Sequence, residues 1–314
     1  MKMNSLVLFS ALFGFGANVA LANAPISAAA PAGFYRLHLG DFEVSVLSDG
    51  TVDLPMSKLL TKITPANYQK SIAKSFITDP IETSDNAFLI NTGSKLVLVD
   101  TGAGKLFGPT LGKLVSNLRA AGYQPEQVDA VLITHMHADH VGGLVAEDKL
   151  VFPNATIYAD KAEGDFWLSA ENLAKAPAAQ KGFFQGAMSS LNPYVKAGKV
   201  KWLTEDTEIV PGVKSHASHG HTAGHTTYIV ESKGKKLVLI GDLIHVGSVQ
   251  FEQPSVCIQF DSDQKGAEQS RKLAFNEAAK DAVIIGAAHL SFPGLGHIRL
   301  EKKAYSFVPL NYSR

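Results

Sequence analysis

The sequence predicts an α/β protein in which β-sheets are covered by helices, and two features of the chain support this. Short apolar runs typical of strands alternate with longer stretches that have helical periodicity. Several of the short runs, such as residues 96–99 and 237–240, are apolar at every position, which indicates strands buried on both faces. No Gly/Ser-rich linker interrupts residues 34–314, so we expect a single domain there.

The expected elements are justified by the length of each run and by the residues that bound it. The expected strands cover residues 42–47, 87–91, 96–99, 128–134, 156–159, 226–230, 237–240 and 283–285. The expected helices cover residues 112–121, 161–169, 183–191 and 264–280, the last of which follows the polar turn Asp261-Ser262-Asp263.

The first 22 residues have the three parts of a secretory signal peptide. Lys2 precedes an apolar run at residues 6–15, and residues 20–22 (Ala-Leu-Ala) fit the cleavage rule, so cleavage is expected after Ala22. A membrane anchor is the alternative, but glycines interrupt the apolar run well short of the ~20 residues that a span needs. We expect a secreted or periplasmic protein without a membrane span, in which residues 23–33 form a flexible lead-in.

Composition limits the partners and the kind of metal site. Lys plus Arg total 29 and Asp plus Glu total 29, so the chain lacks the strong positive charge typical of nucleic-acid binders. Cys257 is the only cysteine, which excludes an intramolecular disulfide and a cysteine-built zinc site. Any metal must therefore be held by His, Asp or Glu. Seven of the eleven histidines fall into two clusters: His135, His137, His140 and His216, His219, His221, His225.

The first cluster lies directly after an expected strand and has the spacing of a metal-binding segment. In an extended chain His135, His137 and Asp139 point to the same side. If a helix begins near Asp139, His140 turns to a neighbouring direction, so this segment offers ligands to two adjacent cations. A polar turn with incidental histidines is the alternative interpretation.

Further ligands are needed, because two imidazoles alone leave a metal under-coordinated. Three candidates follow the first cluster, and each lies next to an expected strand. His221 lies on a glycine-flanked loop before residue 226, Asp242 follows the strand at 237–240, and His289 follows the run at 283–285.

This ordered set of motifs resembles the metallo-β-lactamase-fold hydrolase superfamily. The stretches at residues 97–102, 106–112, 165–169 and 289–299 are similar to the methyl parathion hydrolase family and its lactonase-like (dihydrocoumarin hydrolase) relatives. The resemblance implies a hydrolase domain over residues 34–314. Its fold would be an αβ/βα four-layer sandwich of two mixed β-sheets flanked by helices, with a binuclear site at the edge of the sheets.

The resemblance also assigns the ligands. His135, His137 and His221 would hold the first metal, Asp139, His140 and His289 the second, and Asp242 would bridge them. Two divalent ions per chain are implied, with zinc expected and manganese, cobalt or iron as alternatives. A hydroxide shared by the two ions beside Asp242 would attack the substrate.

The remaining histidines have simpler expected roles. His225 is expected to orient a ligand, with direct coordination as the alternative, and His297 competes with His289 for the last ligand position. Asp100, His38, His216 and His219 are expected to be structural or surface residues, and Cys257 a small apolar side chain.

By the same resemblance, Phe107, Trp167 and Phe184 line an aromatic pocket for the leaving group. Ordinary core packing is the alternative for Phe184, because Met188 and Leu191 follow it at helical spacing. His245, Ile258 and Phe260 are also expected to contact the substrate. At these three positions, organophosphate-active relatives carry Leu, Thr and Leu.

The ligand set alone does not choose the substrate, but it disfavours several reactions. β-Lactamases of this fold lack an acidic bridging ligand at the position of Asp242, and the di-iron oxidoreductase branch replaces the residue at His137 by Glu. Glyoxalase-type thioester hydrolysis is hard to reconcile with export.

We expect a small hydrophobic substrate: an aromatic lactone or aryl ester, with weak hydrolysis of organophosphate triesters. A primary organophosphate hydrolase is the alternative within this chemistry. A secreted metal-binding protein without turnover is the alternative from another class, and a homodimer is compatible with the sequence.

Overall fold

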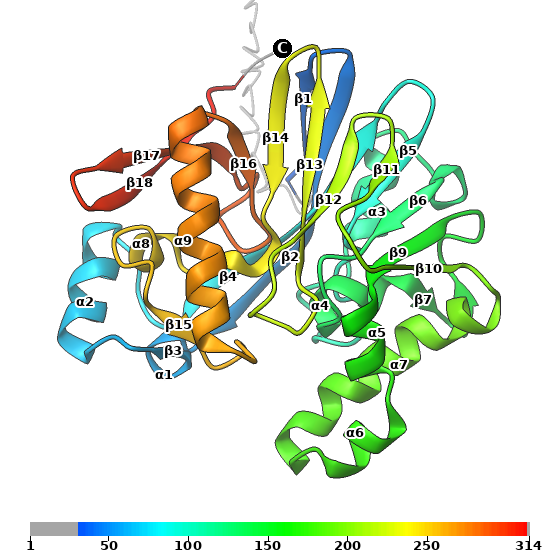
Figure 1. The fold of residues 1–314 in the computed structure, drawn as a ribbon, viewed down its shortest axis with the longest axis horizontal. Coiled ribbons are helices and arrows are strands. Elements are labelled where there is room, and N and C mark those ends of the chain that lie inside the picture. The colour runs from blue at the N-terminus through cyan, green and yellow to red at the C-terminus, as the bar shows by residue number, and fades with distance from the viewer. Residues whose placement is uncertain (1–30, 313–314) are drawn as a thin grey trace, which may run out of the picture. The chain divides into compact units, whose positions relative to one another are not determined.

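Two seven-stranded mixed sheets form the centre of the computed structural model, which describes residues 31–312 (Figure 1). The first sheet has the order β1-β2-β4-β5-β6-β9-β10, antiparallel up to β5 and parallel from β5 onward. Its strands are β1 (Phe34–Leu39), β2 (Phe42–Leu54), β4 (Ile81–Asn91), β5 (Leu96–Val99), β6 (Ala130–Leu132), β9 (Thr156–Asp160) and β10 (Val200–Leu203).

The second sheet has the order β11-β12-β13-β14-β16-β17-β18, and only β14 and β16 pair in parallel. Its strands are β11 (Glu208–Val210), β12 (Val213–Ala217), β13 (Thr226–Ser232), β14 (Lys235–Leu239), β16 (Ile284–Gly286), β17 (Leu295–Glu301) and β18 (Ala304–Pro309). Two small sheets pair β3 (Leu60–Thr61) with β15 (Cys257–Ile258) and β7 (Val145–Ala146) with β8 (Lys149–Leu150).

The apolar strands are buried on both faces, as predicted. In β5, Val97 and Val99 belong to the core between the two sheets, where they join residues of β13 and β14. Leu96 and Leu98 of the same strand belong to the outer core, which the helices cover. Since successive side chains of a strand point to opposite faces, a run that is apolar throughout can line two cores.

Helices cover the outer face of each sheet, so the layers run helix, sheet, sheet, helix (Figure 1). On the first sheet these are α3 (Leu114–Ala120), α5 (Lys161–Trp167) and α7 (Lys181–Lys196), with α6 (Ala170–Lys175) beside them. On the second sheet it is α9 (Gln264–Asp281). The short helices are α1 (Met56–Leu59), α2 (Pro65–Lys74), α4 (Ala138–Val141) and α8 (Gly247–Gln250). The predicted αβ/βα sandwich is confirmed.

Every expected strand and helix is present; the strand at 96–99 has the expected ends, and the others have shifted ends. The strand expected at 128–134 is shortened to β6, because the chain leaves the sheet after Leu132. The strands β1, β10, β11, β12, β17 and β18, the two small sheets, and the helices α1, α2, α6 and α8 were not expected. The expected signal peptide at residues 1–22 lies outside the described residues. Among residues 31–312, no helix is both long and apolar enough to cross a membrane.

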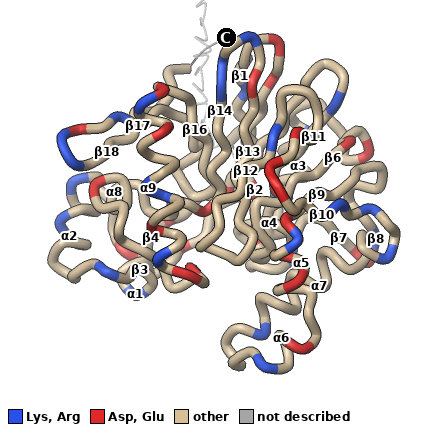
Figure 2. The backbone as a smooth tube through the Cα atoms, viewed as in Figure 1, with Lys and Arg blue, Asp and Glu red and all other residues tan. Residues whose placement is uncertain are grey.

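Charged residues of both signs are interspersed along the described backbone (Figure 2). Basic and acidic segments alternate on α9 and on the β17–β18 hairpin in this view, whereas the charged residues of α2 are all basic. The basic and acidic residues, which are equal in number, are therefore not separated into two large patches of opposite charge on this side of the molecule.

Candidate metal centre

All seven predicted ligands converge where strands of the two sheets end. One segment after β6 supplies four of them, and the loop between β12 and β13, the turn after β14 and the loop after β16 supply one each. In chain order they are His135, His137, Asp139, His140, His221, Asp242 and His289. Strand ends place these loops side by side although they are far apart in sequence.

The first group of ligand atoms comprises His135, His137, His221 and Asp242, whose donor atoms all lie within 4.8 Å of one another. Nδ1 of His137 is 3.0 Å from Nε2 of His135 and 3.2 Å from Nε2 of His221. Oδ2 of Asp242 is 3.6 Å and 3.4 Å from the same two Nε2 atoms. This spacing lets three imidazoles and one carboxylate share a single cation.

The second group comprises Asp139, His140 and His289, again within 4.8 Å. Oδ2 of Asp139 is 3.8 Å from Nε2 of His140 and 3.7 Å from Nε2 of His289. Asp242 contacts this group as well, with its Oδ1 3.3 Å from His140 Nε2 and its Oδ2 3.1 Å from His289 Nε2. Asp242 thus lies between the two groups, as a bridging ligand would.

Two buried atoms of the predicted ligands lack a hydrogen-bond partner among the described residues: Nε2 of His140 and Oδ1 of Asp242. Leaving buried polar atoms unpaired is unfavourable, and such atoms in a native fold point to a missing ligand or water. Imidazole nitrogens and carboxylate oxygens are the donors that zinc, iron, cobalt and manganese accept. The residues therefore fit two divalent cations.

Three of the histidines are oriented by hydrogen bonds from their outer nitrogens. Nδ1 of His140 donates to Asp100 and Nδ1 of His221 donates to Asp261, both at 2.8 Å, and Nδ1 of His289 donates to the Ser84 carbonyl at 3.0 Å. Each bond places the proton on Nδ1, so Nε2 keeps the lone pair that a metal requires. Asp100 was expected to be structural, whereas the roles of Asp261 and Ser84 were missed.

Glu163 joins the two histidine loops and was also missed. Its buried carboxylate accepts hydrogen bonds from the backbone N–H groups of Met136, at 2.8 Å, and Gly224, at 2.7 Å. Burial raises the pKa of Glu163, although these hydrogen bonds oppose that shift. The interaction fixes the position of the first histidine cluster relative to the loop of His221.

His225 is buried beside the centre, but both of its ring nitrogens are already engaged. Nδ1 donates to Ser218 Oγ at 2.9 Å, and Nε2 accepts from the backbone N–H of Asp242 at 3.1 Å. Burial lowers the pKa of His225 to about 3, which keeps the imidazole neutral as this acceptor role requires. His225 therefore positions Asp242 and has no free nitrogen for a metal.

Apart from His245, which borders the centre, the other four histidines lie away from it. His297 is in β17, where its Nδ1 donates to the Val283 carbonyl at 3.1 Å, so it does not replace His289. His38, His216 and His219 are not buried, and the last two pair with Asp206 and Asp160.

Burial and neighbouring charge give the ligands different protonation properties. Burial holds the pKa of His135 and of His137 well below the usual histidine value. Burial opposes ionisation of Asp242, but the surrounding imidazoles hold its pKa well below the usual range. Burial would also lower the pKa of His289, but Asp242 raises it to about 9. A cation at the second group therefore competes with a proton on His289.

The predicted aromatic pocket is partly core. Trp167 and Phe184 are buried in the outer core of the first sheet, with ring centroids 4.8 Å apart. The Trp167 ring lies 5.3 Å from His137 in an edge-on arrangement. Phe183, which was not predicted as a pocket residue, is half-buried, and its ring centroid lies 5.3 Å from that of His137. We refer to Trp167, Phe183 and Phe184 as the aromatic wall.

Phe107 lies half-buried in the loop after β5, and no ring contact among residues 31–312 joins it to the aromatic wall. Phe260 lies across from Phe183, at 6.3 Å, and 6.4 Å from the ring of His245. Ile258 is fully buried in the cluster that packs α1 and α2 against β15, where it pairs with Leu60. Phe260 and His245 thus border the centre, while Ile258 supports them from the neighbouring core.

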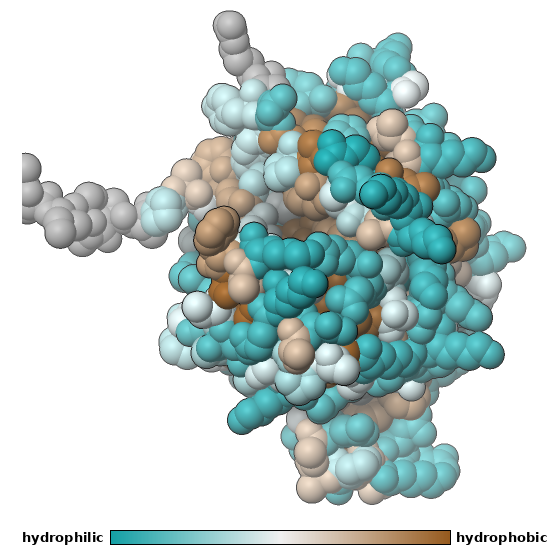
Figure 3. All heavy atoms as spheres, turned by 90° about the vertical axis from the view of Figure 1, so that its left-hand side faces the viewer, coloured by the Kyte–Doolittle hydropathy of each residue, from teal (hydrophilic) through white to brown (hydrophobic). Residues whose placement is uncertain are grey.

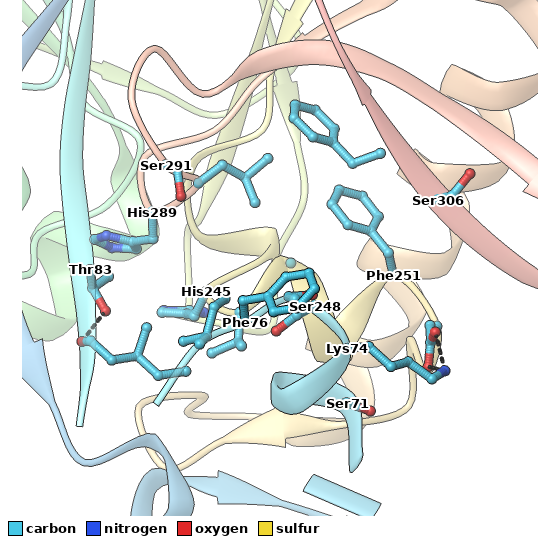
Figure 4. Close-up of a pocket in the computed structure, with 18 of the residues that line it drawn as sticks. Ser71, Lys74, Phe76, Thr83, His245, Ser248, Phe251, His289, Ser291 and Ser306 are labelled. Carbon is cyan, nitrogen blue, oxygen red and sulfur yellow. Dashed lines mark hydrogen bonds and ion pairs between the residues drawn. The ribbon is translucent and has the colours of Figure 1, made fainter. Parts of the chain in front are cut away.

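A cavity of about 1430 Å³ extends from the centre towards α2, α8 and the β17–β18 hairpin. Figure 4 shows His245 and His289 at one side of it and Phe251 and Ser306 at the other. On this face of the molecule, hydrophobic side chains are visible between a larger number of hydrophilic ones (Figure 3). The cavity exceeds the size of typical small-molecule sites.

Comparison with known proteins agrees with this geometry. The sequence model of the metallo-beta-lactamase superfamily matches residues 81–289, a range that ends at the last predicted ligand. The N-acyl homoserine lactonase of Bacillus cereus is 25% identical over 226 residues, covering 68% of this chain and 80% of that protein.

Two solved structures are similar over most of the chain. The hydrolase AbOPH of the beta lactamase superfamily has 36% sequence identity and a TM-score of 0.85, covering 91% of this chain and 100% of that one. AidC, a dizinc quorum-quenching lactonase in complex with a product, has 28% identity and a TM-score of 0.84, covering 90% and 99%. The chain therefore belongs to the metallo-β-lactamase superfamily and is a metal-dependent hydrolase with lactonase homologues.

Proposed function

We propose that this hydrolase opens aromatic lactones or aryl esters and cleaves organophosphate triesters only weakly. The observation that carries the proposal is the pair of half-buried rings, Phe183 and Phe260, whose centroids lie 6.3 Å apart at an interplanar angle of 59° beside the ligand cluster. Aromatic groups meet at such separations, so the two rings contact each other and form an aromatic surface at the mouth of the site, against which a flat aryl ring can pack.

When bound, the two cations would supply a nucleophile derived from water near neutral pH and would polarise the substrate carbonyl. The chain's own residues hold and orient this centre. Asp242 stays ionised between the two groups, and His225 fixes its backbone. Asp100 and Asp261 hold the imidazoles of His140 and His221 in the metal-binding tautomer.

The shape of the mouth favours a lactone over a phosphotriester. A phosphotriester must place three ester arms around a tetrahedral phosphorus, whereas a fused aromatic lactone presents a flat ring and one carbonyl. The buried His245 occupies space beside Asp242, and the ring of Phe260 lies 6.4 Å from that of His245. Smaller side chains there would be needed for a third ester arm.

Acyl-homoserine lactones are a second candidate class, favoured by the cavity that leads away from His245 and His289. An acyl chain could extend along it while the lactone carbonyl lies at the centre. The relatives that carry this activity in their names match most of the chain.

A substrate panel on purified, metal-loaded protein tests the proposal. We expect kcat/KM to be highest for dihydrocoumarin and lowest for a methyl parathion-like triester, with N-hexanoyl homoserine lactone as the comparison for the cavity. A value for the triester equal to or above that for the lactone would instead make the chain primarily an organophosphate hydrolase. Absence of turnover of all three by fully loaded protein would favour a metal-binding role without catalysis.

We also propose export to the periplasm or the exterior, on the basis of the signal-like residues 1–22. N-terminal sequencing of the protein recovered from its producing cell should begin at Asn23. A mature protein that retains Met1 or Lys2 would contradict this.

A further inference from the structure

His245 has a position that its expected role in binding substrate does not explain. It lies three residues after Asp242, with its Nε2 3.0 Å from Oδ2 of that carboxylate. The same oxygen is 3.1 Å from Nε2 of His289. The rings of His245 and His289 are stacked with centroids 5.1 Å apart and an interplanar angle of 22°.

The environment of His245 leaves its imidazole without a hydrogen-bond partner among the described residues. The side chain is buried, and the contact of its Nε2 with the Asp242 carboxylate is an ion-pair contact rather than a hydrogen bond. His225 is equally buried and has both nitrogens engaged. A buried imidazole in which neither nitrogen makes a hydrogen bond is unusual, since buried polar groups are normally paired.

The backbone of His245 is nevertheless held firmly. Oε1 of the buried Gln250 accepts hydrogen bonds from the backbone N–H groups of His245, at 2.8 Å, and Val246, at 3.0 Å. The main chain is thus fixed where the side chain reaches the ligand cluster. A ring that faces the cluster without a hydrogen bond to protein is available for a cation.

We propose that His245 is an eighth metal ligand, which joins Asp242 and His289 in holding a divalent cation. The donor atoms of these three buried residues lie within 4.8 Å of one another, as those of the two predicted groups do. The proposal rests on the binuclear centre proposed above and adds a ligand to it. His245 also lines the large cavity, so a molecule entering from that side meets this ligand together with His289 (Figure 4).

No anchoring hydrogen bond restrains the outer nitrogen of His245, unlike those of His140, His221 and His289. Such outer bonds strengthen a metal ligand, so a ligand without one is held less tightly. We therefore expect His245 to be the ligand that incoming molecules displace most easily.

The test uses the full protein loaded with two equivalents of Co²⁺. Proton NMR of the cobalt protein reports one shifted, exchangeable imidazole N–H for each bound histidine. The five histidines of the seven-residue set and His245 predict six such signals, and His245→Leu should leave five. Chelator competition should show about tenfold or more weaker binding of one ion in His245→Leu, with the other ion unchanged.

His245→Gln is the second variant, since it retains a polar side chain of similar length if Leu disturbs folding. His216→Gln, a surface change, is the control and should keep all six signals. Five signals in the wild type, with cobalt affinities equal in wild type and His245→Leu, would overturn the proposal. If KM for dihydrocoumarin then rose in that variant, His245 would act on substrate instead. Failure of the wild type to bind two cobalt ions would contradict the binuclear centre itself.

Discussion

The metal centre and the aromatic wall border each other but are built in different ways. The centre consists of side chains on short loops at strand ends, and two of its histidines are fixed by hydrogen bonds to buried carboxylates. The aromatic wall lies on α5 and α7, where rings pack on one another without hydrogen bonds to fix their direction. The comparison shows that hydrogen bonds fix the positions of the ligand side chains. The substrate pocket is instead shaped by packed rings, which can readjust when a neighbour changes.

The largest effect is expected from Asp242→Ala, which removes the one carboxylate shared by both groups. Loss of an outer partner typically costs about 10- to 100-fold in metal affinity or activity, and loss of this ligand should exceed that for both. Metal content after dialysis and kcat for an aryl ester measure the effect. Full retention of both ions would show that Asp242 does not bridge them.

Asp100→Asn and Asp261→Asn should separate the two halves of the centre. Each weakens the hydrogen bond that orients one histidine, His140 or His221, so each should reduce affinity mainly for one ion, by about 10- to 100-fold. Stepwise metal titration distinguishes the two ions. Indistinguishable titration curves for the two variants would argue against two separate groups.

Phe183→Ala and Phe184→Ala test whether one of these neighbouring residues of the aromatic wall mainly binds substrate while the other mainly stabilises the fold. Phe184 is 3% exposed in the core, so its loss should destabilise the fold by about 3 to 5 kcal/mol in urea unfolding. Phe183 is half-buried and faces His137, so its loss should raise KM for aryl substrates about tenfold, or ~1.4 kcal/mol, with a smaller loss of stability. The reverse pattern would show that Phe184 is the pocket residue.

The combination His245→Leu, Ile258→Thr and Phe260→Leu should shift the preference from lactone towards triester. Each change removes bulk or an ionisable group beside the metal centre or in the core behind it. We expect the ratio of kcat/KM for triester over lactone to rise about tenfold, which corresponds to ~1.4 kcal/mol in transition-state energy. The ratio of kcat/KM for the two substrates measures it. No change in this ratio would remove these positions from the account of specificity.

The smallest effect is expected from His216→Ala, because this histidine is exposed and pairs only with Asp206. A surface change of this kind usually stays within about 0.5 kcal/mol of the wild-type stability. Metal content and kcat should be unchanged, which makes the variant a control for the histidine-rich composition. A loss equal to that of Asp242→Ala would mean that the ligands are wrongly assigned.

The fold class could be predicted from the sequence, and so could the position of the seven ligands next to strands. Both depend on apolar runs and on the residues beside them, which are local features of the chain. It did not identify Asp261, Glu163 or the Ser84 carbonyl as supports of the ligands. These act across 27 to 205 residues of chain, and nothing in their own neighbourhood marks them.

The pocket was harder to predict for a different reason. Phe183 and Phe184 are adjacent, so which of them faces the centre depends on the rotation of α7 about its axis. Tertiary packing sets that rotation. Similarly, Ile258 and Phe260 were expected to face the substrate together, but β15 ends at Ile258, which is fully buried in a hydrophobic core. Phe260 packs against the same core but is only half-buried, and its ring also contacts those of Phe183 and His245.

Metal stoichiometry of the wild-type protein tests the central claim most directly. Elemental analysis after reconstitution and removal of free metal should give two divalent ions per chain, since the seven converging side chains form two groups with one shared carboxylate. A value clearly below one ion per chain, with the circular dichroism of a folded protein, would contradict the binuclear centre and the hydrolytic function built on it.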